Sequence, residues 1–308
     1  MGQPFSMNSN LILWLRFVGV DFWMVALFPF YIGFVISSES FYSSNLLYGI
    51  LSICFLTSST FVLNHILDLD LDKKNPRKSF SLLVRNEISS KNSFIFFIFL
   101  SSICLLFSLT INHGFVICIL GLILISLLYN IPPFRLKNKP ILDVLCHTLS
   151  LGILCPIAGW CLSDSSGFIN AFSNFPFLYL ISISFYVTAL HSPTMAVDFN
   201  ADITSGVTTF ATKFGAERTM LFSWLLTTAG ATILFISGYL VIEPWSSRIF
   251  LLTGWLLPLE VLVHYYVLPI NELPTYSTVF RGSIILATIE ALFTILFLSL
   301  YVSEASLS

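Results

Sequence analysis

Nine long runs of mainly apolar residues, separated by short polar segments, follow one another along the chain. They lie near residues 11–37, 46–67, 93–111, 115–132, 141–163, 175–197, 219–241, 248–269 and 280–302. Roughly 20 apolar residues in a helix cross the hydrocarbon core of a bilayer. Because lipid offers the backbone no hydrogen-bond partners, each run is expected to be a helix rather than a strand. The pattern predicts an all-α integral membrane protein, a bundle of nine transmembrane helices that forms one domain over residues 1–308.

The composition agrees with a membrane protein and excludes other classes. Hydrophobic residues make up 56% of the chain and charged residues only 10%, whereas soluble domains carry about 25% charged residues. The net charge of −2 argues against a surface that binds nucleic acid. The six cysteines lie in apolar stretches without a CxxC pair, which predicts small buried side chains rather than disulfides or a zinc site. The first run is too long for a cleavable signal peptide.

The basic residues predict an orientation in the membrane. With nine spans, all but one of the 14 Lys and Arg residues fall on one face, and only Arg248 falls on the other. By the positive-inside rule, the basic face and the N-terminus are expected to be cytoplasmic. The bias also favours nine spans, because an error in the middle of the count would distribute the charges over both faces.

An acidic motif follows the second apolar run. Asn64, Asp68 and Asp72 are spaced four residues apart, which places their oxygens on one face of a helix, while Asp70 falls on another. Neighbouring carboxylates repel one another unless a cation lies between them, and oxygen ligands suit Mg²⁺. The alternative is a helix end with solvated charges. It accounts poorly for Asn64 and Asp68, which lie deeper in the apolar run, where ionisable groups are costly.

A second acidic motif follows the sixth apolar run and repeats this spacing. Asp198 and Asp202 are four residues apart, and Lys213 supplies a cation nearby. The two motifs fall on the same predicted face, four helices apart, which suggests two four-helix repeats followed by a ninth helix. A ligand that needs carboxylates on two sides together with basic residues is a diphosphate bridged through Mg²⁺.

Three segments together resemble the UbiA superfamily of intramembrane prenyltransferases. They are the NxxxDxxxD motif that begins at Asn64, the DxxxDxxxG motif that begins at Asp198 with its Thr-rich continuation to Lys213, and the segment 129–137, which reads YNIPPFRLK. One position departs from the family pattern, which usually has Asp after the first Asn, whereas this chain has His65. Residues 75–78, 135–143 and the segment around His191 resemble the lycopene-elongase-like branch.

The resemblance implies a Mg²⁺-dependent prenyltransferase. It would transfer a prenyl group from a polyprenyl diphosphate to a hydrophobic acceptor such as a polyene, a quinone precursor or a chlorophyllide-like molecule, and release diphosphate. The implied metal ligands are Asn64, Asp68, Asp72, Asp198 and Asp202. The implied substrate-binding residues are Arg77, Lys78, Tyr129, Asn130, Arg135, Lys137 and Lys213. The expected partners are the diphosphate donor, the acceptor and membrane lipid.

Several alternatives stay open at this point. Asp143, at the start of the fifth run, is either the catalytic base or an ion-pair partner of Arg135 or Lys137. His147, one helical turn later, and His191 either belong to the site or are buried, hydrogen-bonded histidines. The sequence offers no role for Glu260. A terpene cyclase would use the same motifs with the cation quenched within its own prenyl chain, and a lipid transporter or binding protein would also carry buried charges.

Overall fold

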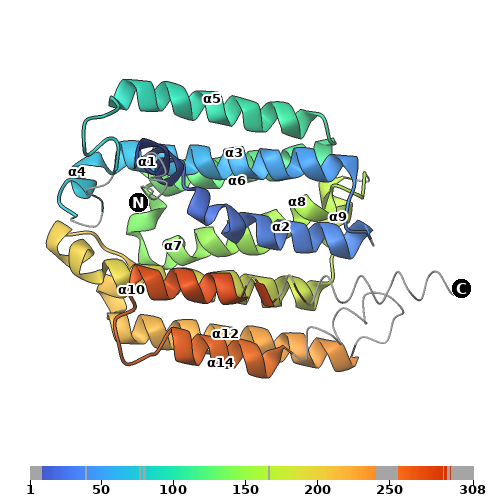
Figure 1. Ribbon diagram of the computed structural model, residues 1–308. Coiled ribbons are helices and arrows are strands. Elements are labelled where there is room, and N and C mark those ends of the chain that lie inside the picture. The colour runs from blue at the N-terminus through green and yellow to red at the C-terminus, as the bar shows by residue number, and fades with distance from the viewer. Residues whose placement is uncertain are drawn as a thin grey trace, which may run out of the picture.

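The computed structural model describes residues 9–38, 40–75, 78, 81–165, 167–240, 256–286, 288, 289 and 292. Over these residues the chain is helical and contains no sheet, and the long helices lie side by side in one bundle (Figure 1). The helices are α1 (Ser9–Phe17), α2 (Trp23–Ser38), α3 (Ser44–Leu67), α4 (Leu69–Asp72), α5 (Ser90–Leu109), α6 (His113–Asn130), α7 (Pro140–His147), α8 (Cys155–Trp160), α9 (Phe168–Asn174), α10 (Phe177–Ser205), α11 (Phe210–Phe214), α12 (Ala216–Leu240) and α14 (Leu257–Val267). A π-helix, η4 (Thr148–Leu154), joins α7 to α8, and the short 3₁₀ helices η1 (Val20–Phe22) and η3 (Leu136–Asn138) precede α2 and α7.

Seven of the helical segments are long and apolar enough to cross a membrane, so the chain is a multi-pass integral membrane protein. They are Val20–Ser38, Ser44–Leu67, Ser90–Leu109, His113–Asn130, Pro140–Trp160, Phe177–Ser205 and Ala216–Ser237. They correspond to the first seven apolar runs. The predicted runs 248–269 and 280–302 extend into residues outside the described ones, although α14 and residues 276–286 within or beside them are helical.

The first run is not the single helix that the sequence predicts. Gly19 has a φ of 68°, in the left-handed region, and it separates α1 from η1 and α2. A Cβ at this position would lie 2.5 Å from Cγ of Phe61, so only glycine fits here. The chain turns at Gly19, and α1 lies beside the end of α3 that carries the first acidic motif (Figure 1).

Close helix packing fixes the centre of the bundle. A Cβ at Gly33 of α2 would lie 1.9 Å from the carbonyl oxygen of Pro156 of α8, and one at Gly159 would lie 1.8 Å from that of Phe30. Small residues let helix backbones approach this closely in membranes. The aromatic rings of Phe30 and Phe34 fill the space beside this contact and are fully buried.

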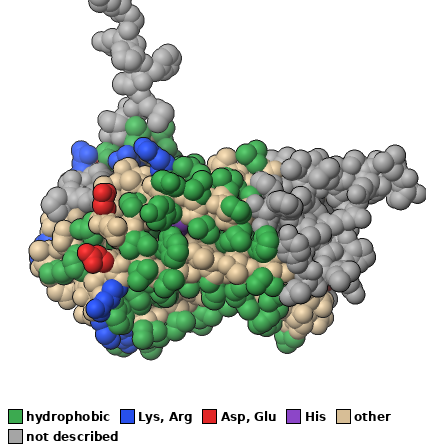
Figure 2. All heavy atoms as spheres, turned by 90° about the horizontal axis from the view of Figure 1, so that it is seen from below, with side chains coloured by type: hydrophobic (Ala, Val, Ile, Leu, Met, Phe, Trp, Pro, Cys, Tyr) green, Lys and Arg blue, Asp and Glu red, His purple; other side chains and the backbone are tan. Residues whose placement is uncertain are grey.

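The outer surface divides into an apolar band and a charged end. On α5, Phe94, Ile95, Ile98 and Phe99 are all about half exposed, which suits contact with lipid. In Figure 2, hydrophobic side chains cover the middle of the molecule, and the Lys, Arg, Asp and Glu side chains in view gather near one end. The same end holds α4 and the C-terminal part of α10 (Figure 1), so the fold brings the two acidic motifs to one end of the bundle.

Candidate active site

A cavity of about 820 Å³ opens among the helices and is lined by residues from both acidic motifs. Asn64, Asp68 and Asp72 reach it from α3 and α4, and Asp198 and Asp202 reach it from α10. Of the other predicted site residues, Lys78, Tyr129, Asn130, Lys137 and Asp143 also line the cavity. Residues more than 100 positions apart thus contribute oxygen and nitrogen atoms to one enclosed space.

The first motif does not lie on one continuous helix. α3 ends at Leu67, Asp68 has φ −101° and ψ 6°, and α4 begins at Leu69. The prediction that the three residues lie on one face of a single helix is therefore wrong. All three oxygen-bearing side chains still line the cavity. Asp72 is buried and its Oδ2 lies 3.4 Å from Nδ1 of His65. His65, the departure from the family pattern, also stacks on Phe17 with ring centres 5.4 Å apart, which ties α1 to α3.

Two basic residues from the segment after α6 hold Asp68. Arg135 donates from Nη2 to Oδ1 at 2.6 Å, and Lys137 donates from Nζ to Oδ2 at 2.6 Å. Lys137 also donates to Oδ1 of Asn64 at 2.8 Å and to Oδ1 of Asn130 at 3.1 Å. Arg135 has a φ of 35°, and the tight turn that it makes before η3 places both basic side chains beside α3.

Burial and charge act on Lys137 in opposite directions. Its side chain is 11% exposed. Burial lowers the pKa of the Lys137 ammonium from its ordinary value, while the adjacent Asp68 carboxylate favours the charged form and opposes that shift. A cation held between two carbonyl oxygens and a carboxylate at the cavity wall is well placed to meet an anionic ligand.

The second acidic motif lies near the C-terminal end of α10. The helix ends at Ser205 and is capped by Gly206, whose φ of 70° suits glycine, and Asp202 lies in the last turn. Thr209 then begins α11 with a capping box. Lys213 on α11 is exposed, with its ammonium 5.5 Å from the ring centre of Phe214, and it does not line the cavity. The structure therefore does not bring Lys213 to the other predicted site residues, and its role stays a prediction. Arg77 lies outside the described residues.

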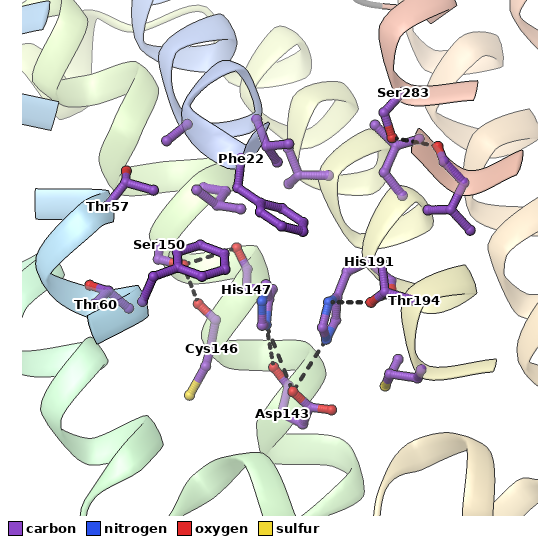
Figure 3. Close-up of a pocket in the computed structure, with 18 of the residues that line it drawn as sticks. Phe22, Thr57, Thr60, Asp143, Cys146, His147, Ser150, His191, Thr194 and Ser283 are labelled. Atoms are coloured by element: carbon purple, nitrogen blue, oxygen red, sulfur yellow. Dashed lines mark hydrogen bonds and ion pairs between the residues drawn. The ribbon is translucent and has the colours of Figure 1, made fainter. Parts of the chain in front are cut away.

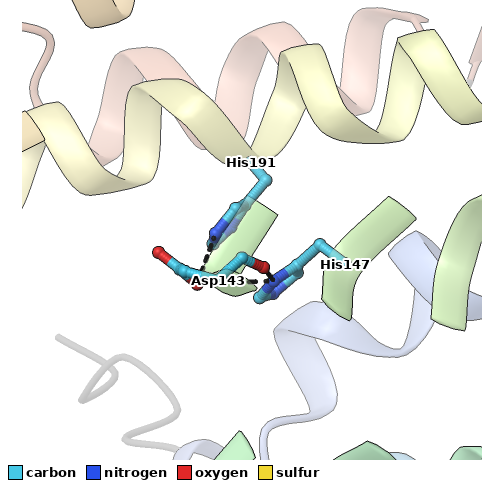
Figure 4. Close-up of side chains that lie close together, drawn as sticks. All are labelled: Asp143, His147 and His191. Carbon is cyan, nitrogen blue, oxygen red and sulfur yellow. Dashed lines mark hydrogen bonds and ion pairs between the residues drawn. The ribbon is translucent and has the colours of Figure 1, made fainter. Parts of the chain in front are cut away.

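Asp143 forms a separate cluster in the cavity wall, shown in Figures 3 and 4. Its Oδ1 accepts a hydrogen bond from the hydroxyl of Tyr129 at 2.9 Å and lies 3.2 Å from Nε2 of His191. Nδ1 of His147 lies 3.3 Å from the backbone oxygen of Asp143 and 3.8 Å from its Oδ1. The two imidazoles stack with their centres 3.4 Å apart and an interplanar angle of 12°.

The contacts of Asp143 decide one alternative that the sequence left open. Arg135 and Lys137 both bind Asp68, whereas Asp143 contacts Tyr129 and the two histidines. The interpretation of Asp143 as their ion-pair partner is therefore wrong. The spacing of Asp143 and His147 already indicated that they share a helix face. His191 comes from α10, so its place in the cluster depends on packing that the sequence does not reveal.

The rest of the cavity wall is mostly apolar and rich in aromatic rings, with scattered Ser and Thr side chains. It includes Phe22, Phe28, Phe61, Tyr179, Tyr186, Tyr276 and Phe280. Glu260 of α14 also lines the cavity, is 1% exposed and accepts a hydrogen bond from the hydroxyl of Tyr186. The cavity therefore combines a polar part with a long apolar part, the shape that a molecule with a charged head and a hydrocarbon chain requires.

The family model described as the UbiA prenyltransferase family matches residues 26–300. The chain belongs to the UbiA prenyltransferase family. A UbiA homologue from Archaeoglobus fulgidus, solved with GPP and Mg²⁺, has the same fold, with a TM-score of 0.76 at 21% identity over 93% of this chain and 99% of that one. The membership agrees with the resemblance of the three sequence segments.

Two curated relatives are prenyltransferases whose names give different acceptors. The chloroplastic 2-acylphloroglucinol 4-prenyltransferase of Humulus lupulus is 32% identical over 187 residues, 56% of this chain and 41% of that protein. The chain thus spans about two fifths of the length of that relative. The protoheme IX farnesyltransferase of Blochmanniella floridana is 28% identical over 237 residues, 72% of this chain and 78% of that protein.

Proposed function

We propose that this UbiA-family chain transfers a prenyl group from a prenyl diphosphate to a hydrophobic acceptor inside the membrane, with Mg²⁺ as its cofactor. The observation that carries the proposal is the single cavity that holds both acidic motifs, a buried lysine and an apolar wall. The named activities of the curated relatives support it, as do the GPP and Mg²⁺ bound by the Archaeoglobus homologue.

The donor atoms of the two motifs fit Mg²⁺. Asn64, Asp68, Asp72, Asp198 and Asp202 offer only oxygen, which Mg²⁺ prefers and which zinc sites seldom use alone. Each oxygen of Asp68 already accepts from one cation, and a carboxylate has roughly four lone-pair positions, so both oxygens retain capacity for a metal ion. When bound, Mg²⁺ would offset the negative charge that grows on the diphosphate as it leaves.

The basic and polar residues beside the first motif would bind the diphosphate. Lys137 and Lys78 line the cavity, and Arg135 lies within hydrogen-bonding distance of Asp68. We propose that these cations, with Asn130, hold the diphosphate oxygens, and that Arg77 joins them. Tyr129, which the sequence also predicts to bind substrate, donates its one hydroxyl proton to Asp143 and would have to release it to bind diphosphate. Fixed positive charges aimed at a leaving group stabilise the charge that develops there without reorganisation of solvent.

The aromatic wall would protect the allylic cation that remains. The faces of Phe22, Phe61 and Tyr179 attract a cation through their π electrons, and an apolar cavity keeps water away from it. The acceptor then attacks the cation and loses a proton. The Asp143 cluster lies in the same wall, so we propose that Asp143 belongs to the catalytic group at the acceptor end.

The acceptor is proposed to be a conjugated, largely apolar molecule. A polyene, a quinone precursor and a chlorophyllide-like ring all meet this description, and the two relatives are named for a phloroglucinol and a protoheme.

We further propose that residues 1–308 form one domain of nine transmembrane helices, two four-helix repeats and a ninth helix. The N-terminus and both acidic motifs would face the cytoplasm.

Mass spectrometry of the products tests the proposed function. The purified protein is incubated with Mg²⁺ and dimethylallyl, geranyl, farnesyl or geranylgeranyl diphosphate, each with lycopene, 4-hydroxybenzoate, a 2-acylphloroglucinol, chlorophyllide or no acceptor. A prenylated adduct, formed together with diphosphate, is the expected result and identifies the acceptor class. A cyclic hydrocarbon formed without acceptor would instead identify a terpene cyclase, and absence of diphosphate release would contradict both enzymes.

A further inference from the structure

The hydrogen bonds around Asp143 fix the tautomer of His147. A backbone carbonyl only accepts hydrogen bonds, so the contact of 3.3 Å between Nδ1 of His147 and the Asp143 oxygen requires a proton on Nδ1. Neutral His147 then carries a lone pair on Nε2. Within the described part of the chain, no group hydrogen-bonds this Nε2 atom. His147 lines the cavity and its side chain is 25% exposed (Figure 3).

The Oδ1 atom of Asp143 is already engaged by neighbouring side chains. Its side chain is 3% exposed, and its Oδ1 is already contacted by the Tyr129 hydroxyl and His191. The same oxygen lies 3.8 Å from Nδ1 of His147. A buried carboxylate beside the protonated nitrogen of an imidazole holds the ring in one tautomer and stabilises the imidazolium that forms when the other nitrogen takes a proton.

The stacked rings argue against the alternative use of the cluster as a metal site. One ligand atom from each of Asp143, His147 and His191 lies within 4.8 Å of the others, so the grouping is a candidate. Two imidazoles bound to one tetrahedral ion at about 2.0–2.1 Å would hold their ring centres about 5 Å apart. The observed separation is 3.4 Å with nearly parallel rings (Figure 4), so both rings would have to rotate to bind one ion.

We infer that Nε2 of His147 is the atom that takes the proton from the prenylated acceptor, and that Asp143 is its positioning residue. The inference rests on the proposed function. The C–O bond of the donor breaks and the electron pair leaves with diphosphate. A C–C bond then forms between the allylic carbon and the acceptor. The acceptor C–H bond breaks last, its electron pair restores the conjugated system, and its proton passes to Nε2. The imidazolium gives up the proton to water when product leaves.

His191 and Tyr129 both contact Oδ1 of Asp143 and help to hold this carboxylate in place. The Thr194 hydroxyl donates to the backbone oxygen of His191 at 2.6 Å, and its oxygen lies 3.4 Å from Nδ1 of the same residue. Nε2 of His191 faces Asp143. In neutral His191 the proton is on Nε2, which faces the Asp143 carboxylate, so Nδ1 can only accept, with the Thr194 hydroxyl 3.4 Å away. His147 instead keeps the lone pair of Nε2 for the cavity. The two stacked rings therefore have different roles: His147 accepts the proton, and His191 holds Asp143.

The test compares two products of one reaction in His147→Ala and His147→Asn. Asn retains an N–H donor near the position of Nδ1 and lacks the Nε2 lone pair, so it controls for folding. His113→Ala is the matched control. His113 is exposed and is the first residue of α6, whereas the cavity lies at the opposite end of this helix, where its last residue lines the wall. Diphosphate and prenylated adduct are measured together with geranyl diphosphate, Mg²⁺ and the acceptors named above.

The wild type and His113→Ala should release one diphosphate per adduct. In both His147 variants, adduct formation should fall about 10²–10⁴-fold, the usual contribution of a general base. Diphosphate release should fall much less, because water that enters the space left by the smaller side chain captures the cation as geraniol, and added imidazole should restore adduct in His147→Ala. Equal losses of both products, or no loss of either, would overturn the inference.

A visible Co²⁺ spectrum that the wild type shows and His147→Ala lacks would also overturn the inference, in favour of a metal site. Wild-type protein that releases diphosphate and forms no adduct would refute the transferase function itself.

Discussion

Nζ of Lys137 lies 2.6 Å from Oδ2 of Asp68, although the two residues are 69 positions apart in the chain. The contact joins the segment after α6 to the end of α3 and places a cation directly beside the first acidic motif. Both side chains are largely buried, so each charge depends on the other for compensation. The pair thereby prepares a site in which metal ligands and a diphosphate-binding cation are already adjacent.

Lys137→Gln should weaken both the fold and the binding of the donor. Asp68 would keep Arg135 but lose its second cation, which should lower the free energy of unfolding by about 1–3 kcal/mol. The KM for the prenyl diphosphate should rise at least tenfold. Thermal unfolding in detergent and steady-state kinetics measure the two effects. Lys139→Gln is the matched control, since Lys139 is exposed and outside the cavity; equal effects of the two substitutions would contradict the role of Lys137.

Mg²⁺ together with inorganic diphosphate should raise the thermal midpoint of the wild type. A ligand at 100 times its Kd stabilises the folded state by about 2.7 kcal/mol. Asp198→Asn removes one proposed carboxylate ligand and should abolish most of this shift, measured for each variant against its own ligand-free midpoint. Glu87→Gln, an exposed carboxylate paired with Arg85, should leave the shift unchanged. A full shift in Asp198→Asn would remove Asp198 from the proposed metal ligands.

Gly152→Ala should disturb the Asp143 cluster through the packing of η4 on α10. A Cβ at Gly152 would lie 2.7 Å from Cα of Ser184 and 2.8 Å from its Oγ, so η4 must move away from α10. His147 lies just before η4 and His191 lies on α10, so the ring stacking should loosen. Adduct formation should fall at least tenfold relative to diphosphate release. In Gly121→Ala the new Cβ meets only the side chain of Leu154, with Cδ1 at 3.1 Å and Cδ2 at 3.9 Å, and a side-chain rotation relieves the contact.

Much of the fold follows from the sequence because lipid imposes a simple rule. A run of about 20 apolar residues has to be helical, and seven predicted runs have a corresponding helical span. The break at Gly19 was missed because hydropathy is continuous across it. The signal was present in the glycine itself, but its need for a positive φ depends on Phe61, which approaches from α3.

The candidate site was partly predictable for a different reason. Spacing shows which side chains share a helix face, so Asp143 and His147 could be paired in advance. It cannot show which helices meet. The pairing of Asp68 with Arg135 and Lys137, the contact of His65 with Asp72 and the arrival of His191 at Asp143 all depend on packing between distant segments. Proximity in sequence is no better guide, since Lys213 follows Asp202 closely in the chain and yet does not line the cavity.

The most direct test of the central claim compares Asp68→Asn with Asp70→Asn. Asp70 is exposed and outside the cavity, two residues from Asp68 in the same motif. Diphosphate release from geranyl diphosphate is measured in both variants, with Mg²⁺, with EDTA and after Mg²⁺ is restored. The account predicts that Asp68→Asn loses release by at least 10³-fold, about 4 kcal/mol at the barrier. Asp70→Asn should keep nearly full activity that EDTA stops and Mg²⁺ restores. Full release by Asp68→Asn, or release that persists in EDTA, would contradict the account.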